Sequence, residues 1–244
     1  MFNLKKTLLS AAIGFSGFTY AQNCTTTGCN STPFLTDDFS IPSLWTSVDY
    51  DNATGSFNFA NGRANFTRND VNTYSRIQGL ACARETRIYR TLPVTLSNTS
   101  FKAQFDFEVK GGNCPWQHLL SFTAGTLDPY ATLSGCNAYP SACGTYLYSN
   151  QDAINIDLFG TGTSSAFNDR PITGNTWVIR VTTRKGTVDV NSPTTIPFNQ
   201  ANTRFYASFE RVGGSNGVLS IFSDAARTTQ IPGSPLCFPI DPTI

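Results

Sequence analysis

Apolar and polar residues alternate along most of the chain. The clearest case is FKAQFDFEV, residues 101–109, in which every second residue is apolar. A period of two is typical of a β-strand that turns one face toward a core. Similar patterns predict strands in ETRIYRTLPV, WQHLLSFTAG, AINIDLFG, TWVIRVTTRKG, RFYASFERVGG and GVLSIFSD. Helical spacing is hard to find after residue 21, so the pattern predicts an all-β protein.

The segment GSFNFANGRANFT predicts a β-hairpin. Its dipeptide Asn61-Gly62 accepts the positive φ angles of a two-residue type I′ turn. Apolar residues flank this turn at alternate positions: Phe57, Phe59, Ala64 and Phe66. Many strands joined by turns rich in Gly, Asn, Pro and Ser favour two antiparallel sheets packed as a sandwich over a parallel sheet with helical crossovers.

The N-terminus predicts export. A basic start, MFNLKK, precedes TLLSAAIGFSGF, an apolar run too short to span a bilayer, and small residues follow. This order is typical of a secretory signal peptide, residues 1–21, cleaved after Ala21. We expect a protein that is secreted, extracellular or at the cell surface, with no membrane-spanning segment in the mature chain. Residues 22–36 would form a leader tied by cysteines, and 37–244 a single domain.

Charge and composition exclude one class of partner. The net charge is +1 and only 14% of the residues are charged. No basic stripe runs along the chain, so we expect no nucleic-acid partner. Aromatic residues make up 13% of the chain, which suits half-buried pleated surfaces.

All seven cysteines follow the signal segment. In an exported protein, disulfides are the expected state. A metal site is the alternative, but the chain has no C-x-x-C spacing and one histidine. We predict that Cys237 is unpaired, and the candidate pairs are Cys24 with Cys29, Cys136 with Cys143, and Cys82 with Cys114.

The segment DDFSIPSLWTSVDYDNATGSFNFANGRANFT resembles the opening of concanavalin A-like jelly rolls, including laminin-G-like modules of bacterial secreted proteins of the Bacteroidetes type. FKAQFDFEV and ASFERVGGSNGVLSIFSDAARTT are similar to later strands, so the resemblance runs from about Asp37 to Ile240. It implies a two-sheet antiparallel jelly-roll sandwich. This fold hosts lectins, glycosidases, lyases and adhesive modules, so the resemblance does not select a function.

The carboxylates of residues 101–109 raise the question of catalysis. Laminarinase-type endoglucanases of this fold resemble E-x-D-x-E on one strand, and a retaining mechanism needs both outer carboxylates. Here the same-face positions are Gln104, Asp106 and Glu108. An amide stands at the nucleophile position and cannot attack an anomeric carbon. A solvated strand face, a sugar-binding face and a hydrolytic site all stay open.

A sugar-binding site would use the amide of Gln104 and the carboxylates of Asp106 and Glu108 as hydrogen-bonding groups. It also needs an aromatic platform, which Trp116 in CPWQH could supply. Further tyrosines come from the long irregular stretch GTLDPYATLSGCNAYPSACGTYLYSNQ: Tyr130, Tyr139 and Tyr146. The expected partner is a polysaccharide or a surface glycan.

Elimination chemistry has weaker support. Alginate-lyase jelly rolls resemble R-[ST]-E-x-R and Q-x-H, but the spacing of ARETR is off by one and Gln117 and His118 are adjacent. By simple alternation His118 falls with Trp116, Leu120 and Phe122, which predicts a partly buried imidazole. If this single histidine has a structural role, no histidine is left as the base, which excludes most Ser-His-Asp and Cys-His catalytic arrangements.

A structural Ca²⁺ is the remaining cofactor candidate. Asp38 and Asp241, with help from Asp37, could supply hard oxygen ligands if the two ends of the domain meet. Two ordinary surface aspartates are the alternative. The sequence therefore favours a secreted, non-catalytic glycan-binding or adhesion module. A polysaccharide-degrading enzyme, either glycoside hydrolase or lyase, and a purely structural surface module are the alternatives.

Overall fold

The computed structural model describes residues 35, 37, 39–49, 55–68, 86–93, 95–109, 116–124, 152–160, 177–186, 188–198 and 203–244. These residues form β-strands and one short 3₁₀ helix, η1 (Pro42–Leu44). Every strand pairing in this part of the chain is antiparallel. The prediction of an all-β protein is confirmed. The described residues include no helix of membrane-spanning length and hydropathy.

The larger sheet has five strands. β10, β8, β7 and β6 lie in this order, and β9 also pairs with β8. β9 and β10 pair with opposite ends of β8, so together they line one edge of the sheet. The strands span Trp116–Thr123 (β6), Ala153–Gly160 (β7), Trp177–Lys185 (β8), Val188–Asn191 (β9) and Ile196–Phe198 (β10).

The second sheet has four strands in the order β13-β12-β11-β5. β5 precedes the larger sheet in sequence and β11 follows it, yet the two strands pair along nine residues of β5. The chain therefore leaves this sheet after β5, builds the larger sheet, and returns at β11. The strands span Phe101–Val109 (β5), Thr203–Val212 (β11), Asn216–Phe222 (β12) and Leu236–Pro239 (β13).

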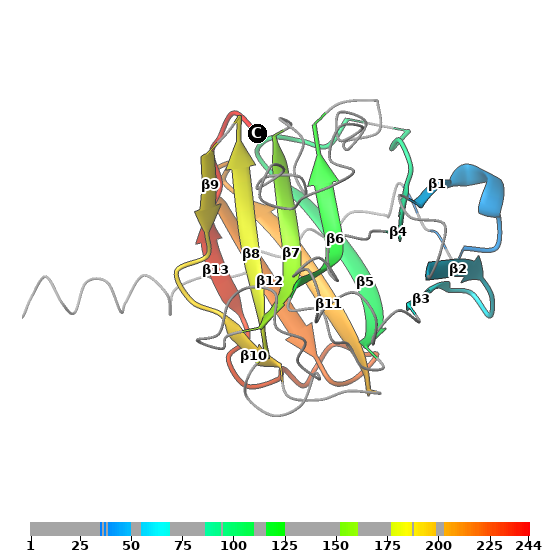
Figure 1. The fold of residues 1–244 in the computed structure, drawn as a ribbon. Coiled ribbons are helices and arrows are strands. Elements are labelled where there is room, and N and C mark those ends of the chain that lie inside the picture. Colours follow the sequence, from blue (N-terminus) through cyan, green and yellow to red (C-terminus); the bar gives the residue numbers. More distant parts are fainter. Residues whose placement is uncertain are drawn as a thin grey trace, which may run out of the picture.

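The two sheets face each other across one core, with the five-stranded sheet in front in Figure 1. Phenylalanines join them: Phe122 of β6 lies 5.2 Å from Phe209 of β11, between ring centroids, and Phe198 of β10 lies 5.1 Å from Phe205. Apolar residues at alternate positions of both sheets belong to the same buried cluster. Burying these faces from water is the main force that holds the sheets together. The arrangement is sandwich-like.

Two small sheets lie beside the larger ones. β1 (Thr46–Asp49) pairs with β4 (Thr86–Tyr89), and β2 (Gly55–Phe59) with β3 (Ala64–Arg68). The predicted hairpin is confirmed, because β2 and β3 pair with Phe57 opposite Phe66. Its turn residues Asn61 and Gly62 have φ of 56° and 68°. Both angles are positive, as a type I′ turn requires.

Candidate functional site

The predicted polar face of β5 lies on the outer side of the four-stranded sheet. Phe101, Phe105 and Phe107 pack against the core, so the residues between them face away from it. Gln104 and Asp106 are exposed and Glu108 is half-buried. The structure therefore brings the three predicted residues of β5 to one face.

Each acidic group of this face has a cation beside it. Asp106 accepts a hydrogen bond from Arg204 of β11 and forms an ion pair with it. Glu108 accepts one from Arg63 of the β2–β3 turn at 2.6 Å. Charge-paired carboxylates of this kind suit a positioning role better than a pair that exchanges protons.

Tyr206 supplies an aromatic ring on the same face. It stands opposite Asp106 in the β5–β11 register, and Gln104 stands opposite Ser208, two pairs further along and so on the same face. The guanidinium carbons of Arg204 and Arg227 lie 5.6 and 5.8 Å from the centre of its ring. Such distances allow a cation–π attraction. We call Gln104, Asp106, Arg204, Tyr206 and Arg227 the Tyr206 cluster.

The aromatic residues predicted for this face have other positions. Trp116 begins β6, so its backbone belongs to the five-stranded sheet and not to the sheet that carries Gln104. The predicted Tyr130, Tyr139 and Tyr146 lie outside the described residues. Sequence reasoning missed Tyr206, although its alternation within RFYASFERV could have indicated a ring on the polar face.

A β-bulge corrects the interpretation of His118. The register of β6 against β7 shifts between His118 and Leu120, so that His118 pairs with Asp157 and Leu120 with Ile156. One unbroken alternation through Leu120 and Phe122 does not hold, because the bulge inserts an extra residue. The register position of His118 is opposite a carboxylate, which the sequence pattern did not predict.

The outer side of the five-stranded sheet carries a second polar group of residues. It contrasts with the Tyr206 cluster because its members are buried: the exposed fraction is 0% for Asp157, 2% for Thr182 and 1% for Arg184. Asn155 is also 0% exposed and its Oδ1 has no hydrogen-bond partner. We call Asn155, Asp157, Thr182 and Arg184 the buried polar layer.

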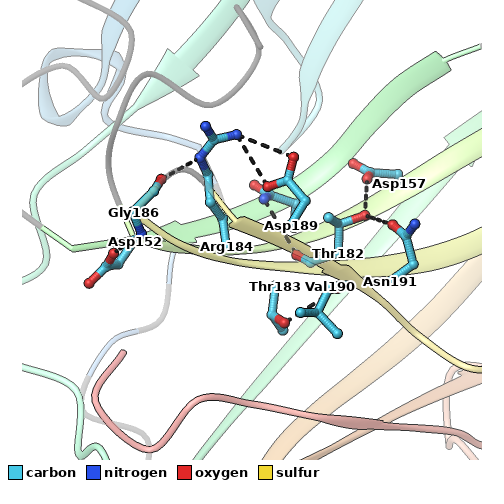
Figure 2. Close-up of polar contacts among 10 residues, drawn as sticks. Asp152, Asp157, Thr182, Thr183, Arg184, Gly186, Asp189, Val190 and Asn191 are labelled. Carbon is cyan, nitrogen blue, oxygen red and sulfur yellow. Dashed lines mark hydrogen bonds and ion pairs between the residues drawn. The ribbon is translucent and has the colours of Figure 1, made fainter.

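Polar contacts link this layer to the edge strand β9, as Figure 2 shows. The Thr182 hydroxyl lies 3.3 Å from Asp157 Oδ2 and 3.1 Å from Asn191 Oδ1, and it can donate its one proton to either. Arg184 donates to both carboxylate oxygens of Asp189 at 3.2 and 3.3 Å. Its Nε donates to the Gly186 carbonyl at 2.8 Å. These side-chain hydrogen bonds therefore help to hold β9 against β8.

The described residues include no group of three or more His, Cys, Asp or Glu side chains arranged to hold a metal. Asp38 lies outside the described residues. Asp241 accepts hydrogen bonds from the Thr243 hydroxyl and from its backbone N–H, which lower the pKa of Asp241. Asp37 accepts hydrogen bonds from Phe39 N–H, Trp45 Nε1–H and Arg90. Calcium binding stays a prediction.

One cysteine prediction is wrong. Cys237 of β13, predicted to be unpaired, is disulfide-bonded. The candidate pairs among Cys24, Cys29, Cys82, Cys114, Cys136 and Cys143 lie outside the described residues. One of these six must be the partner of Cys237 if the bond lies within the chain, so the three candidate pairs cannot all form.

The fold and these two outer faces define an all-β, sandwich-like protein. The outer face of its four-stranded sheet carries exposed polar residues, such as Gln104 and Asp106, beside buried ones, such as Ser208 and Glu210. Comparison of the chain with models of protein families, with curated proteins and with solved structures gave no match.

Proposed function

We propose that this chain is a secreted, non-catalytic glycan-binding or adhesion module whose ligand lies on the Tyr206 cluster. The observation that carries the proposal is the β5–β11 register, which sets Tyr206 beside Asp106 and places exposed Gln104 two pairs away on the same face. In the described part of the chain neither the Gln104 amide nor the Tyr206 hydroxyl has a hydrogen-bond partner. Sugar hydroxyls need such polar groups next to an aromatic surface.

The jelly-roll topology and export belong to this proposal. The return of the chain from the five-stranded sheet to pair β11 with β5 supports a concanavalin A-like jelly roll. The disulfide at Cys237 supports an oxidising compartment outside the cytosol. Glycans on surfaces or in polysaccharides are the partners that such a location offers.

A glycan array and polysaccharide pull-down of the mature chain, with and without calcium, tests the proposal. We expect binding that Tyr206→Ala weakens by about tenfold or more, because the ring and its hydroxyl are both lost. Val188→Ala serves as the control, since Val188 is exposed on β9 of the other sheet. Binding that survives Tyr206→Ala would place the site elsewhere. No binding to any glycan would leave a structural surface module as the better account.

One observation favours an enzyme as the second candidate. His118, Asp157 and Arg180 occupy one register row across β6, β7 and β8. A histidine, a carboxylate and an arginine are groups that acid–base chemistry on a polysaccharide uses, and a substrate would have to reach Asp157, which is 0% exposed in the free chain. Assaying the same samples for release of reducing ends or unsaturated products separates the two functions. Release that Asp157→Asn abolishes, while the protein stays folded, would favour the enzyme and contradict the non-catalytic proposal.

A further inference from the structure

Among the described residues, no carboxylate pairs with Arg227, the second cation of the Tyr206 cluster. Within the described part of the chain its guanidinium makes two contacts: Nε donates to the Ala207 carbonyl at 3.4 Å, and the group stacks on Tyr206. Arg204, in contrast, is paired with Asp106. The two terminal nitrogens of Arg227 therefore keep their donors available to a ligand.

The backbone holds Arg227 over the ring. Its φ is 57°, in the left-handed region that non-glycine residues seldom adopt. Its N–H donates to the Asp224 carbonyl at 3.0 Å. The Asp224 carboxylate accepts from the N–H groups of Thr228 and Thr229, the latter at 2.6 Å. A costly conformation fixed by the surrounding loop positions this guanidinium, whereas a solvated surface arginine needs no such support.

The hydrogen bonds of this loop persist at neutral pH. The backbone N–H of Thr229, followed by the groups of Thr228, lowers the pKa of Asp224. The carboxylate that holds the loop is therefore ionised wherever a binding assay is run near pH 7. The position of Arg227 does not depend on a group that changes its charge in that range.

The charge balance of the cluster selects the class of ligand. Two arginines and one aspartate lie around Tyr206, and the aspartate is occupied by Arg204. A neutral sugar offers Arg227 only neutral acceptors, whereas a carboxylate or sulfate can accept two of its N–H groups at once in stronger, charge-assisted hydrogen bonds. The exposed Gln104 amide and the Tyr206 hydroxyl would then hydrogen-bond to neighbouring sugar hydroxyls.

We infer that the Tyr206 cluster binds an acidic glycan, whose carboxylate or sulfate group is received by Arg227. This inference rests on the proposed glycan-binding function and names its substrate class. It makes Arg227 the residue that determines specificity, while Tyr206 and Gln104 contribute to affinity for any glycan.

The test compares polysaccharides on the same backbone that do or do not carry the acidic group. Binding of the mature chain is measured for polygalacturonate and its fully methyl-esterified form, and for dextran sulfate and dextran. We expect one acidic member to bind at least about tenfold more tightly than its neutral counterpart, because a charge-assisted hydrogen bond is stronger than a neutral one. The pair that shows the preference tells carboxylate from sulfate.

Three variants assign the preference to Arg227. Arg227→Gln should remove the preference for the acidic over the neutral polysaccharide, and Arg227→Lys should restore part of that preference. Lys185→Gln removes the same charge from the other sheet and should have no effect; Lys185 is 42% exposed. Thermal melts check that each variant folds.

The possible outcomes distinguish a failure of this inference from a failure of the proposed glycan-binding function. Equal binding of acidic and neutral members overturns the inference and leaves glycan binding intact. An equal loss in Arg227→Gln and Lys185→Gln also overturns it, because attraction would then come from overall charge. Failure to bind any glycan overturns the proposed function itself.

Discussion

Each outer face of the two large sheets carries an arginine–aspartate pair, and the two pairs have opposite surroundings. On the five-stranded sheet Arg184 is 1% exposed and its partner Asp189 is 35% exposed. On the four-stranded sheet Arg204 is 42% exposed and Asp106 37%. The same chemical pair therefore holds a buried arginine in place on one sheet and lies in contact with solvent on the other.

The difference shows how burial decides what a polar residue does. A charge taken out of water must be compensated by hydrogen bonds, so Arg184 is committed to Asp189 and to the Gly186 carbonyl. A charge left in water loses little when its partner moves away. Arg204 and its neighbours can therefore exchange a protein contact for a ligand contact at small cost, which is what a binding surface needs.

Truncating the two arginines is the strongest test of this comparison. Arg184→Ala should lower the free energy of unfolding by about 3 kcal/mol, since it leaves a cavity and deprives the buried layer of its cation. Arg204→Ala should change it by less than about 0.5 kcal/mol. Urea unfolding followed by tryptophan fluorescence measures both. Equal losses would mean that exposure does not separate the two faces.

Removing one buried and one exposed hydroxyl tests the contrast between buried and exposed polar groups, with smaller expected changes in stability. Thr182→Val keeps the shape of the side chain but removes the donor that serves Asp157 and Asn191, at a cost of about 1–2 kcal/mol. Thr228→Val removes a hydroxyl that donates to Asp224 at the surface, and should cost less than about 0.5 kcal/mol. The same unfolding assay applies. A neutral Thr182→Val would show that the layer contributes packing alone.

The smallest effect concerns two carboxylates at strand ends, Asp152 just before β7 and Asp241 shortly after β13. Hydrogen bonds from the Lys185 side chain and then from Gly186 N–H lower the pKa of Asp152 from its ordinary value, and hydrogen bonds from Thr243 lower the pKa of Asp241. The unfolded chain therefore binds protons first as pH falls, and stability is lost as pH drops through the folded pKa values.

Urea midpoints between pH 7 and pH 2 measure this loss, which should begin below about pH 5. Asp152→Asn removes one titrating group and should make the decline shallower. A decline with unchanged slope in this variant would assign the acid sensitivity to other carboxylates.

Much of the fold could be predicted from local pattern. The alternation of FKAQFDFEV and AINIDLFG gave strands with the bounds that β5 and β7 have, Phe101–Val109 and Ala153–Gly160. The short edge strand β9 was not singled out, because in VDVN all four residues are exposed and no buried face reveals it. The bulge after His118 was also invisible, since an extra residue leaves no mark on composition.

The candidate site, like the fold, could be predicted only where it depends on local pattern. Gln104, Asp106 and Glu108 could be placed on one face because alternation along one strand is a local property. Tyr206 could not be joined to them, since it is distant in sequence and reaches Asp106 only through pairing of β11 with β5. Arg227, which follows β12, joins the cluster through its contact with Tyr206. The disulfide of Cys237 was mispredicted for the same reason.

The sequence by itself determined the all-β class, the type I′ hairpin and the two-sided character of each long strand, because these follow from side-chain spacing and backbone sterics within a few residues. The tertiary structure alone decided which polar side chains are buried and which arginine keeps its donors available. Burial and pairing depend on segments brought together from distant parts of the chain, and the free energy of a charged group depends on what surrounds it.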